Sequence, residues 1–407
     1  MRIIPLFIVL IFPFILFGLN DKNIHSNTSL IKNYTAKTYN ANPQIFSILQ
    51  NKKGVMYFAN QLGVVGYDGR NWNLIKTDNH HVYNLAQDNK GVIYVLCDGD
   101  FGILAPNSVG ELIFKSKLDL FKGLIEDYSF LEFEDITFAK NIAYINTSEG
   151  LFKLNEDKIS KINTANNVIF IKNINDTIYL QIKDQGLHTL ENDTIKALSQ
   201  GLHFTKTLIV DLIQFNSETY VITIDKGIFR INNEKIQIRN TLVDSKITSS
   251  VNNRDINLVL GTTNGILILD KNLTTYKRIG SEEGIADATI KKVYLDHENN
   301  LWLGTQNGIS KVEIDTPIEI FNKQNELNGS IEAIEGFNNT IFCATGNGVY
   351  YLNEQGNAVK VKSIETDCYG LKAINFGTDS ILLVAEVNGV YQIDQKLRVK
   401  KIADGGP

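Results

Sequence analysis

One pattern recurs along almost the whole chain: a short apolar run, a polar turn and then a glycine. The clearest copies are Asn257–Ile266, Leu301–Ile309, Thr340–Val349 and Ile381–Val390. With the weaker copies included, the turn glycines recur about every 41 residues, which is a spacing typical of repeat architectures. These glycines are Gly63, Gly102, Gly150, Gly186, Gly227, Gly265, Gly308, Gly348 and Gly389.

The residues between the glycines indicate strands. The apolar runs are short, rich in Ile, Val, Tyr, Phe and Leu, and interrupted by Asn, Asp and Gly roughly every 8–12 residues. Helical repeats of the HEAT type have a similar period, but the chain shows no sustained helical periodicity. Four short strands in about 40–45 residues are typical of a β-propeller blade. The repeat therefore predicts an all-β protein made of four-stranded antiparallel blades, with one short inserted helix within residues 118–133.

Residues 288–321 show how one repeat is expected to fold. Ala288–Tyr294 is predicted to be the inner strand, followed by strands at Leu301–Thr305 and Ile309–Ile314 and an outer strand at 317–321. Asp and Asn in 296–300 favour a hairpin turn because they bond their own backbone. The Asn307–Gly308 pair favours a type I′ turn, which needs two positive φ values.

Several residues of the repeat have predicted structural roles. Gly304 interrupts a strand, which usually marks the close approach of another backbone, here the neighbouring blade. Trp302 is interpreted as a blade-packing residue, and the polar residues of the turns as turn-forming. The repeat-motif residues are Trp302, Gly304, Thr305, Asn307, Gly308, Gly261, Thr262, Asn264, Gly265, Asn347, Gly348, Asn388 and Gly389.

The segment Asp296–Gly308 resembles the two-component regulator propeller repeat, D-x-x-G-N-L-W-I-G-T-x-x-G-L, with Asn299 in place of its glycine. The first repeat, with Gly63, Tyr67-Asp68-Gly69 and Trp72, is similar to the first blade of that family. The resemblance covers residues 35–407. It implies the periplasmic sensor region of a hybrid two-component regulator of the Bacteroidetes type. Such regions carry seven-bladed propellers, followed by a triple-tyrosine domain, a membrane helix and a cytoplasmic output.

The glycine count predicts where the domains begin and end. Seven turn glycines, from Gly63 to Gly308, predict a seven-bladed propeller over residues 30–316. Ile31–Tyr39 is expected to supply the outer strand of the last blade and so close the ring. Residues 317–407 then resemble the start of a second propeller, of which two blades are present. Two blades cannot close a ring, which suggests a truncated product of a longer gene.

The N-terminus reads as an export signal. Arg2 precedes an apolar run over residues 3–19, and Gly18 lies near its end, as in a secretory signal peptide. Residues 1–20 are therefore predicted to be a signal peptide or a signal anchor. The chain that follows is predicted to lie in the periplasm or on the outer face of the inner membrane.

The composition excludes several functions. A net charge of −5 without a dense Lys/Arg block argues against nucleic-acid binding by this segment. Cys97, Cys343 and Cys368 form no disulfide or zinc pattern, and His80-His81 is interpreted as a solvated loop. No phosphate-binding glycine motif occurs, so no cofactor is predicted.

These observations favour a ligand-sensing region over an enzyme. The predicted partners are a small-molecule or oligosaccharide ligand, the downstream signalling domains of the same polypeptide, and a second copy in a homodimer. No ligand-binding residue is predicted. A secreted binding module or scaffold remains an alternative, and so does a propeller lyase or glycosidase, which would need clustered acid and base residues on one face of the ring.

Overall fold

The computed structural model describes residues 30–78, 81–126, 131–231, 235–236, 245–252, 258–314, 326–353, 357–377 and 379–405. These residues form almost only strands, arranged in four-stranded antiparallel sheets, which confirms the all-β prediction. Two compact units are present, one within Ser29–Glu319 and one within Ile320–Pro407. The predicted signal peptide, the predicted boundary at 316/317 and the predicted strand at 317–321 lie outside the described residues.

Within the described part of Ser29–Glu319 there are seven sheets. The first three contain β2 (Ile45–Gln50), β3 (Met56–Asn60), β4 (Gly63–Tyr67) and β5 (Trp72–Ile75); β6 (Val82–Gln87), β7 (Ile93–Cys97), β8 (Phe101–Pro106) and β9 (Leu112–Ser116); and β10 (Phe133–Ala139), β11 (Ile142–Thr147), β12 (Gly150–Asn155) and β13 (Lys158–Ile162).

The next three sheets contain β14 (Val168–Ile174), β15 (Thr177–Ile182), β16 (Gly186–Glu191) and β17 (Thr194–Ala197); β18 (Ile209–Phe215), β19 (Glu218–Thr223), β20 (Gly227–Arg230) and β21 (Lys235–Ile236); and β22 (Ile247–Asn252), β23 (Leu258–Thr262), β24 (Gly265–Leu269) and β25 (Thr275–Ile279). The seventh combines β26 (Ile290–Leu295), β27 (Asn300–Thr305) and β28 (Gly308–Glu313) with β1 (Leu30–Tyr34).

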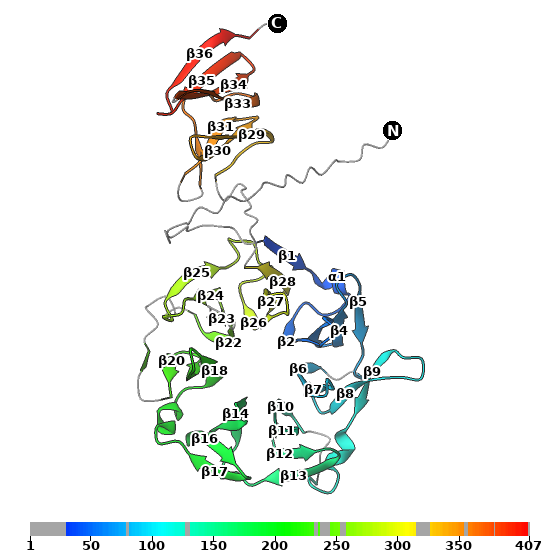
Figure 1. The fold of residues 1–407 in the computed structure, drawn as a ribbon. Coiled ribbons are helices and arrows are strands. Elements are labelled where there is room, and N and C mark those ends of the chain that lie inside the picture. Colours follow the sequence, from blue (N-terminus) through cyan, green and yellow to red (C-terminus); the bar gives the residue numbers. More distant parts are fainter. Residues whose placement is uncertain are drawn as a thin grey trace. The chain divides into compact units, whose positions relative to one another are not determined.

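The seven sheets surround a common centre, with β2, β6, β10, β14, β18, β22 and β26 innermost (Figure 1). Neighbouring innermost strands contact one another in chain order, and β26 contacts β2, so the sheets form a closed ring. The hydrophobic core lies between the faces of adjacent sheets. For example, Val64 and Ile75 of one sheet pack with Val82 and Val95 of the next.

The ring is closed by the first described strand of the chain. β1 pairs antiparallel with β28, from Leu30 opposite Glu313 to Tyr34 opposite Ile309. The side chain of Asn33 strengthens this join, because its Oδ1 accepts a hydrogen bond from Ser310 Oγ at 2.7 Å. The outer-strand prediction for the segment that begins at Ile31 is thus confirmed for β1, and the one-turn helix α1 (Ala36–Tyr39) follows it.

One local prediction was wrong, and one was met by a shorter element. In the turn between β27 and β28 only Gly308 has a positive φ, of 116°, whereas a type I′ turn needs two such residues. The turn is held instead by Thr305, whose hydroxyl accepts a hydrogen bond from Asn307 N at 3.1 Å and donates one to Gly308 O at 2.8 Å. In 118–133 the described helical part is a single 3-10 turn, η1 (Leu118–Phe121), which buries Phe121; a second, η3 (Gly201–Phe204), precedes β18.

The described part of Ile320–Pro407 contains two further sheets of the same kind. They pack on each other through a core that includes Phe342, Val349, Leu382 and Val384. Their strands are β29 (Ile331–Phe337), β30 (Thr340–Thr345), β31 (Gly348–Leu352), β32 (Ala358–Lys360), β33 (Cys368–Phe376), β34 (Asp379–Glu386), β35 (Gly389–Asp394) and β36 (Val399–Asp404). None of the described helices is long and apolar enough to cross a bilayer.

Candidate functional site

Trp302 of β27 packs where the last sheet of the ring meets the first. Its side chain is buried, with 3% exposed, and its ring stacks on Tyr34 of β1 with centroids 5.8 Å apart. On its other sides lie Phe58 and Tyr67 of the first sheet. Trp72 completes the aromatic cluster by stacking on Tyr67 at 4.2 Å. Both tryptophans therefore hold the seam between the two ends of the ring together.

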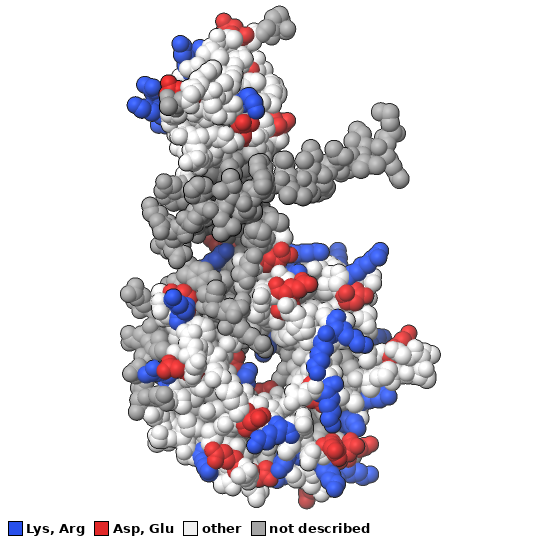
Figure 2. Space-filling view, in the orientation of Figure 1, with Lys and Arg blue, Asp and Glu red and all other residues white. Residues whose placement is uncertain are grey.

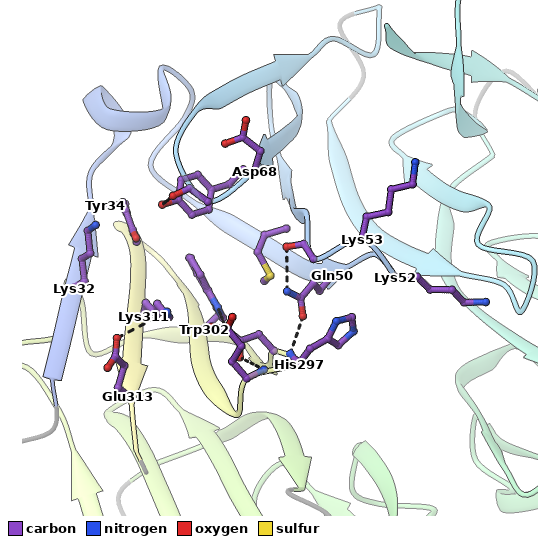
Figure 3. A pocket seen from close by; sticks show the side chains of 16 residues that line it. Lys32, Tyr34, Gln50, Lys52, Lys53, Asp68, His297, Trp302, Lys311 and Glu313 are labelled. Atoms are coloured by element: carbon purple, nitrogen blue, oxygen red, sulfur yellow. Dashed lines mark hydrogen bonds and ion pairs between the residues drawn. The ribbon is translucent and has the colours of Figure 1, made fainter. Parts of the chain in front are cut away.

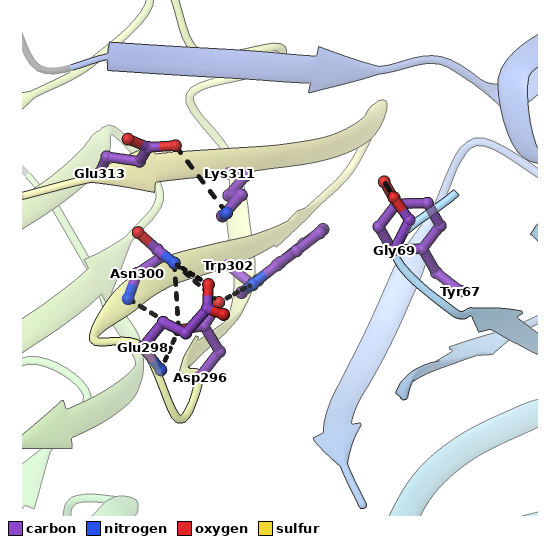
Figure 4. A network of polar contacts seen from close by, with 8 residues as sticks. All are labelled: Tyr67, Gly69, Asp296, Glu298, Asn300, Trp302, Lys311 and Glu313. Carbon is purple, nitrogen blue, oxygen red and sulfur yellow. Dashed lines mark hydrogen bonds and ion pairs between the residues drawn. The ribbon is translucent and has the colours of Figure 1, made fainter. Parts of the chain in front are cut away.

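Asp296 organises the turn beside this cluster (Figure 4). Its Oδ1 accepts hydrogen bonds from Glu298 N at 2.9 Å and Asn300 N at 2.8 Å, which is the backbone bonding expected of Asp in a turn. Its Oδ2 accepts the Trp302 Nε1–H at 2.8 Å. A charged acceptor for a buried indole N–H fixes the ring plane of Trp302.

The remaining motif residues are distributed one set per sheet and do not form a common site. The hydroxyl of Thr262 bonds Asn264 N and Gly265 O as Thr305 bonds Asn307 and Gly308, and Gly348 accepts the same bond from Thr345. Asn347 N also donates to Thr345, and Asn388 N, just before Gly389, donates to Glu386 Oε2.

Two of the strand glycines lie where adjacent sheets approach closely. A Cβ on Gly304 would lie 2.8 Å from Cγ2 of Ile45 in the first sheet. A Cβ on Gly261 would lie 2.8 Å from Cγ2 of Ile290 in the next sheet. Both distances are shorter than real Cβ contacts, so these positions exclude a larger side chain unless the sheets move apart.

A pocket of about 680 Å³ opens over the same seam (Figure 3). We call it the seam pocket. It is walled by β1, by β28 and by three turns, those between β2 and β3, between β4 and β5, and between β26 and β27. Its lining residues are Lys32, Tyr34, Gln50, Lys52, Lys53, Gly54, Met56, Tyr67, Asp68, Gly69, Asp296, His297, Glu298, Trp302, Lys311 and Glu313.

The seam pocket is lined by the edges of aromatic side chains and by charged groups of both signs. Lys32 Nζ lies 5.2 Å from the centroid of Tyr34, and Lys311 Nζ lies 5.9 Å from that of Trp302. Backbone hydrogen bonds from Asn71 and Arg70 hold the pKa of Asp68 below its usual range, so this carboxylate stays ionised. A few convergent polar groups over an aromatic floor suit a small polar ligand.

Gln50 joins the two sides of the seam pocket. Its Oε1 accepts a hydrogen bond from His297 N at 2.8 Å, and its Nε2 donates to Gly54 O at 3.1 Å. The first bond runs from the last sheet to the first, and the second stays within the β2–β3 turn. A ligand in this pocket would therefore touch both partners of the ring closure.

The described residues contain no cluster of three His, Cys, Asp or Glu side chains that could hold a metal ion. The three thiols are free and buried, and burial raises the pKa of Cys97, Cys343 and Cys368, which keeps them protonated. His81 is exposed in a loop, and its neighbour His80 lies outside the described residues.

Comparison with known proteins establishes the fold. No family model matches the sequence, and no curated protein sequence matches it. The structure is similar to that of the extracellular domain assigned to the hybrid two component system BT3049 from B. thetaiotaomicron, with a TM-score of 0.65 and 16% identity. This match covers 92% of the present chain and 54% of that one.

Two further structures share the architecture. One is the extracellular domain assigned to the one component system BT4673 from B. thetaiotaomicron, with a TM-score of 0.57, 14% identity, and coverage of 91% of this chain and 59% of that one. The other is virginiamycin B lyase from Staphylococcus aureus, with a TM-score of 0.52 and 14% identity. The lyase match covers 70% of this chain and 99% of the lyase. The present chain thus spans little more than half the length of the two extracellular domains.

Sequence reasoning missed the seam pocket altogether. Its lining residues come from both ends of the ring, between Lys32 and Glu313 in the chain. Only the closure of the ring by β1 brings them together. The sequence did contain one indication of this pocket. The predicted closure of the ring by the segment that begins at Ile31 implies that the turns at 50–54 and 296–300 are neighbours.

Proposed function

We propose that the chain is the extracytoplasmic ligand-sensing region of a bacterial signal-transduction receptor. The observation that carries this proposal is the extent of the structural likeness. The match to the extracellular domain assigned to a hybrid two component system covers 92% of the chain, and so includes sheets from both units, whereas the lyase match covers 70%. An enzyme composed of one ring accounts for the first unit but leaves the second without a counterpart.

The domain arrangement belongs to the same proposal. Residues 30–316 are a seven-bladed propeller, and residues 317–407 supply the first two blades of a second one. In support, eight of the seventeen exposed large hydrophobic side chains of the described residues lie in Ile320–Pro407, among them Ile334, Tyr369 and Phe376. Apolar faces of this kind are what two blades present when no further blade covers them.

The seam pocket is the ligand site in this proposal, and the ligand is a nutrient-like molecule such as an oligosaccharide. Sugars present both apolar ring faces and hydroxyl groups. The pocket offers only the exposed rims of Tyr34 and Trp302 for the former, since both rings are largely buried, and charged groups of both signs for the latter. Binding would tighten the contact between β1 and the first sheet, and a change in ring closure is a shift that downstream domains could read.

The remaining elements of the proposal concern the whole protein. Residues 1–20 direct export, so that the propeller lies in the periplasm or on the outer face of the inner membrane. Signalling passes to downstream domains of the same polypeptide, and a homodimer would transmit it across the membrane. Reading the gene beyond codon 407 tests this part. A continuing frame with further blades and a membrane helix is expected, and an immediate stop codon would contradict it.

Ligand sensing is tested by titrating the purified full chain with an oligosaccharide panel, using thermal shift and calorimetry. Binding without turnover is expected, and the Lys53→Met variant should weaken it. Lys90→Met is the matched control, because Lys90 follows Asp88 in the β6–β7 turn as Lys53 follows Asn51 in the β2–β3 turn, with equivalent side-chain-to-backbone hydrogen bonds. Cleavage of the glycan by the wild-type chain would favour the lyase or glycosidase alternative. If no oligosaccharide of the panel binds, the alternative of a binding module or scaffold would be favoured.

A further inference from the structure

The centre of the ring contains a layer of polar side chains. Each of the seven innermost strands contributes one: Ser47 (β2), Asn84 (β6), Asp135 (β10), Lys172 (β14), Asp211 (β18), Ser250 (β22) and Lys292 (β26). The side chain of Lys172 remains 41% exposed although seven sheets surround it, so the layer borders solvent-accessible space. The space-filling view shows the same face hollowed at the middle of the ring (Figure 2).

Six of the seven side chains are joined into two chains of hydrogen bonds. In the first, Ser47 Oγ bonds Asn84 Oδ1 at 3.0 Å, and Asn84 Nδ2 donates to Asp135 Oδ1 at 2.9 Å. In the second, Lys172 Nζ pairs with Asp211 Oδ1 at 2.9 Å, and Ser250 Oγ donates to Asp211 Oδ2 at 2.7 Å. The second chain is neutral overall, because the ammonium and the carboxylate compensate each other.

The seventh side chain of the layer, Lys292, belongs to neither of these two hydrogen-bonded series. Among the described residues, no hydrogen bond and no ion pair within 4 Å joins its ammonium to a partner. Its pKa is lowered by burial and then by the charge of Lys172, while Asp211 and Asp135 act to raise it. Asp135 and Lys172 lie on β10 and β14, across the ring from β26, and Asp211 lies on β18, two innermost strands away from it (Figure 1). Lys292 thus lies on an innermost strand, within electrostatic reach of three charged groups of the central layer.

Asp135 is the matching group of opposite charge. Its Oδ1 accepts both Asn84 Nδ2 and Ile136 N, whereas no hydrogen bond to a described residue reaches its Oδ2. Burial raises the pKa of Asp135 to about 6, and the nearby Lys292 and Lys172 only partly offset that effect. The centre of the ring thus holds a carboxylate and an ammonium that act on each other's pKa but form no ion pair within 4 Å.

From this juxtaposition we propose that the centre of the ring is a binding site for a free α-amino acid, whose carboxylate pairs with Lys292 and whose ammonium pairs with Asp135. Enclosed charges are costly unless they are paired, and a zwitterion pairs both without adding net charge. A simple anion would pair with Lys292 but would leave Asp135 Oδ2 without a partner. A simple cation would pair with Asp135 but would leave Lys292 unpaired.

This site is separate from the seam pocket and does not depend on the sensing proposal. It is tested with the full chain and the standard L-amino acids as probes, by thermal shift and then by calorimetry. At least one amino acid is expected to bind. Its amide, which lacks the carboxylate, and its N-acetyl derivative, which lacks the ammonium, should each bind about tenfold more weakly or worse, since each leaves one enclosed charge unpaired.

Variants complete the test. Lys292→Met and Asp135→Asn should each weaken binding of that amino acid about tenfold or more, whereas Lys291→Met, one residue away on the same strand, and the seam-pocket variant Lys53→Met should leave it unchanged. Circular dichroism and melting of the unliganded variants establish that they fold. The proposal is overturned if no amino acid binds, if the amide or the N-acetyl derivative binds as tightly as the parent, or if both central variants retain wild-type affinity.

Discussion

Removal of strand β1 should open the ring at the seam. β1 is the outer strand of the last sheet. In the sequence, however, it precedes the first sheet, whereas its partner β28 follows all the other strands of the ring. The point variant Tyr34→Ala removes its main buried side chain, which is 5% exposed and packs against Trp302, Trp72 and Tyr67. Deletion of residues 30–40 removes the strand, its ladder to β28 and the fully buried Tyr39 together.

The size of the effect follows from the packing. Truncating a large buried aromatic side chain to Ala costs about 3–5 kcal/mol of unfolding free energy. For a domain of this size, about 1 kcal/mol corresponds to roughly 2–4 °C in Tm, so Tyr34→Ala should lower Tm by about 6–20 °C. The deletion should lower it further or abolish cooperative unfolding, because the loss approaches the total stability of about 5–15 kcal/mol of a typical domain.

The measurement is thermal and urea unfolding followed by circular dichroism. Tyr83→Ala is the matched control, since Tyr83 lies on the innermost strand β6 but is 40% exposed, and its truncation should change the unfolding free energy by less than about 1 kcal/mol. Wild-type Tm in the deletion variant, or equal effects of Tyr34→Ala and Tyr83→Ala, would refute the view that β1 closes the ring.

Three further predictions concern packing, charge and thiol chemistry. Gly304→Val should lower the unfolding free energy by about 1–3 kcal/mol because the added side chain overfills the contact between the last and first sheets. Gly336→Val is the control and should leave the unfolding free energy nearly unchanged, because a Cβ there meets no atom within 4 Å. If both variants melt at the same temperature, Gly304 does not lie at a close contact between sheets. Because the pKa of Asp135 is raised in the folded state to about 6, its ionisation favours the unfolded chain, and this group's contribution to stability is lost as pH rises from about 4 through 6. Asp135→Asn should therefore stabilise the protein by about 1–3 kcal/mol at pH 8 but not at pH 4, as urea unfolding at both pH values will measure; a gain that is the same at both would contradict the raised pKa. The three cysteines should resist iodoacetamide at pH 7.5 until urea unfolds the chain, and mass spectrometry of the native protein would disprove this by detecting rapid labelling.

The repeat made much of the fold predictable, because its turns carry local signals. The strand predicted at Leu301–Thr305 is observed at Asn300–Thr305, and the turn residue Asn299 has a positive φ of 63°. The type I′ prediction failed because Asn307 and Gly308 were taken as the two central residues of the turn. The central residues are Gln306 and Asn307, since Thr305 pairs with Gly308.

The two candidate sites could not be predicted, for a physical reason. The central layer takes a single polar residue from each innermost strand, such as Asp135 and Lys292, and within its own strand each resembles an ordinary interruption of an apolar run. Only the ring places them together. The seam pocket likewise exists because residues near 32 and near 311 become neighbours when β1 pairs with β28.

During synthesis, Asn33 leaves the ribosome 277 residues ahead of Ser310, the partner to which it bonds. At about 5–20 residues per second, β1 waits on the order of 15–60 s before its partner strand exists. The intervening sheets can form by local pairing in that time, whereas the join between β1 and β28 has to be made last and across the longest loop. Until then β28 offers an unpaired edge to any other chain. The pairing of β1 with β28 is therefore the folding step at which misassembly is most favoured. Its rate should determine how long the unpaired edge of β28 remains open to aggregation.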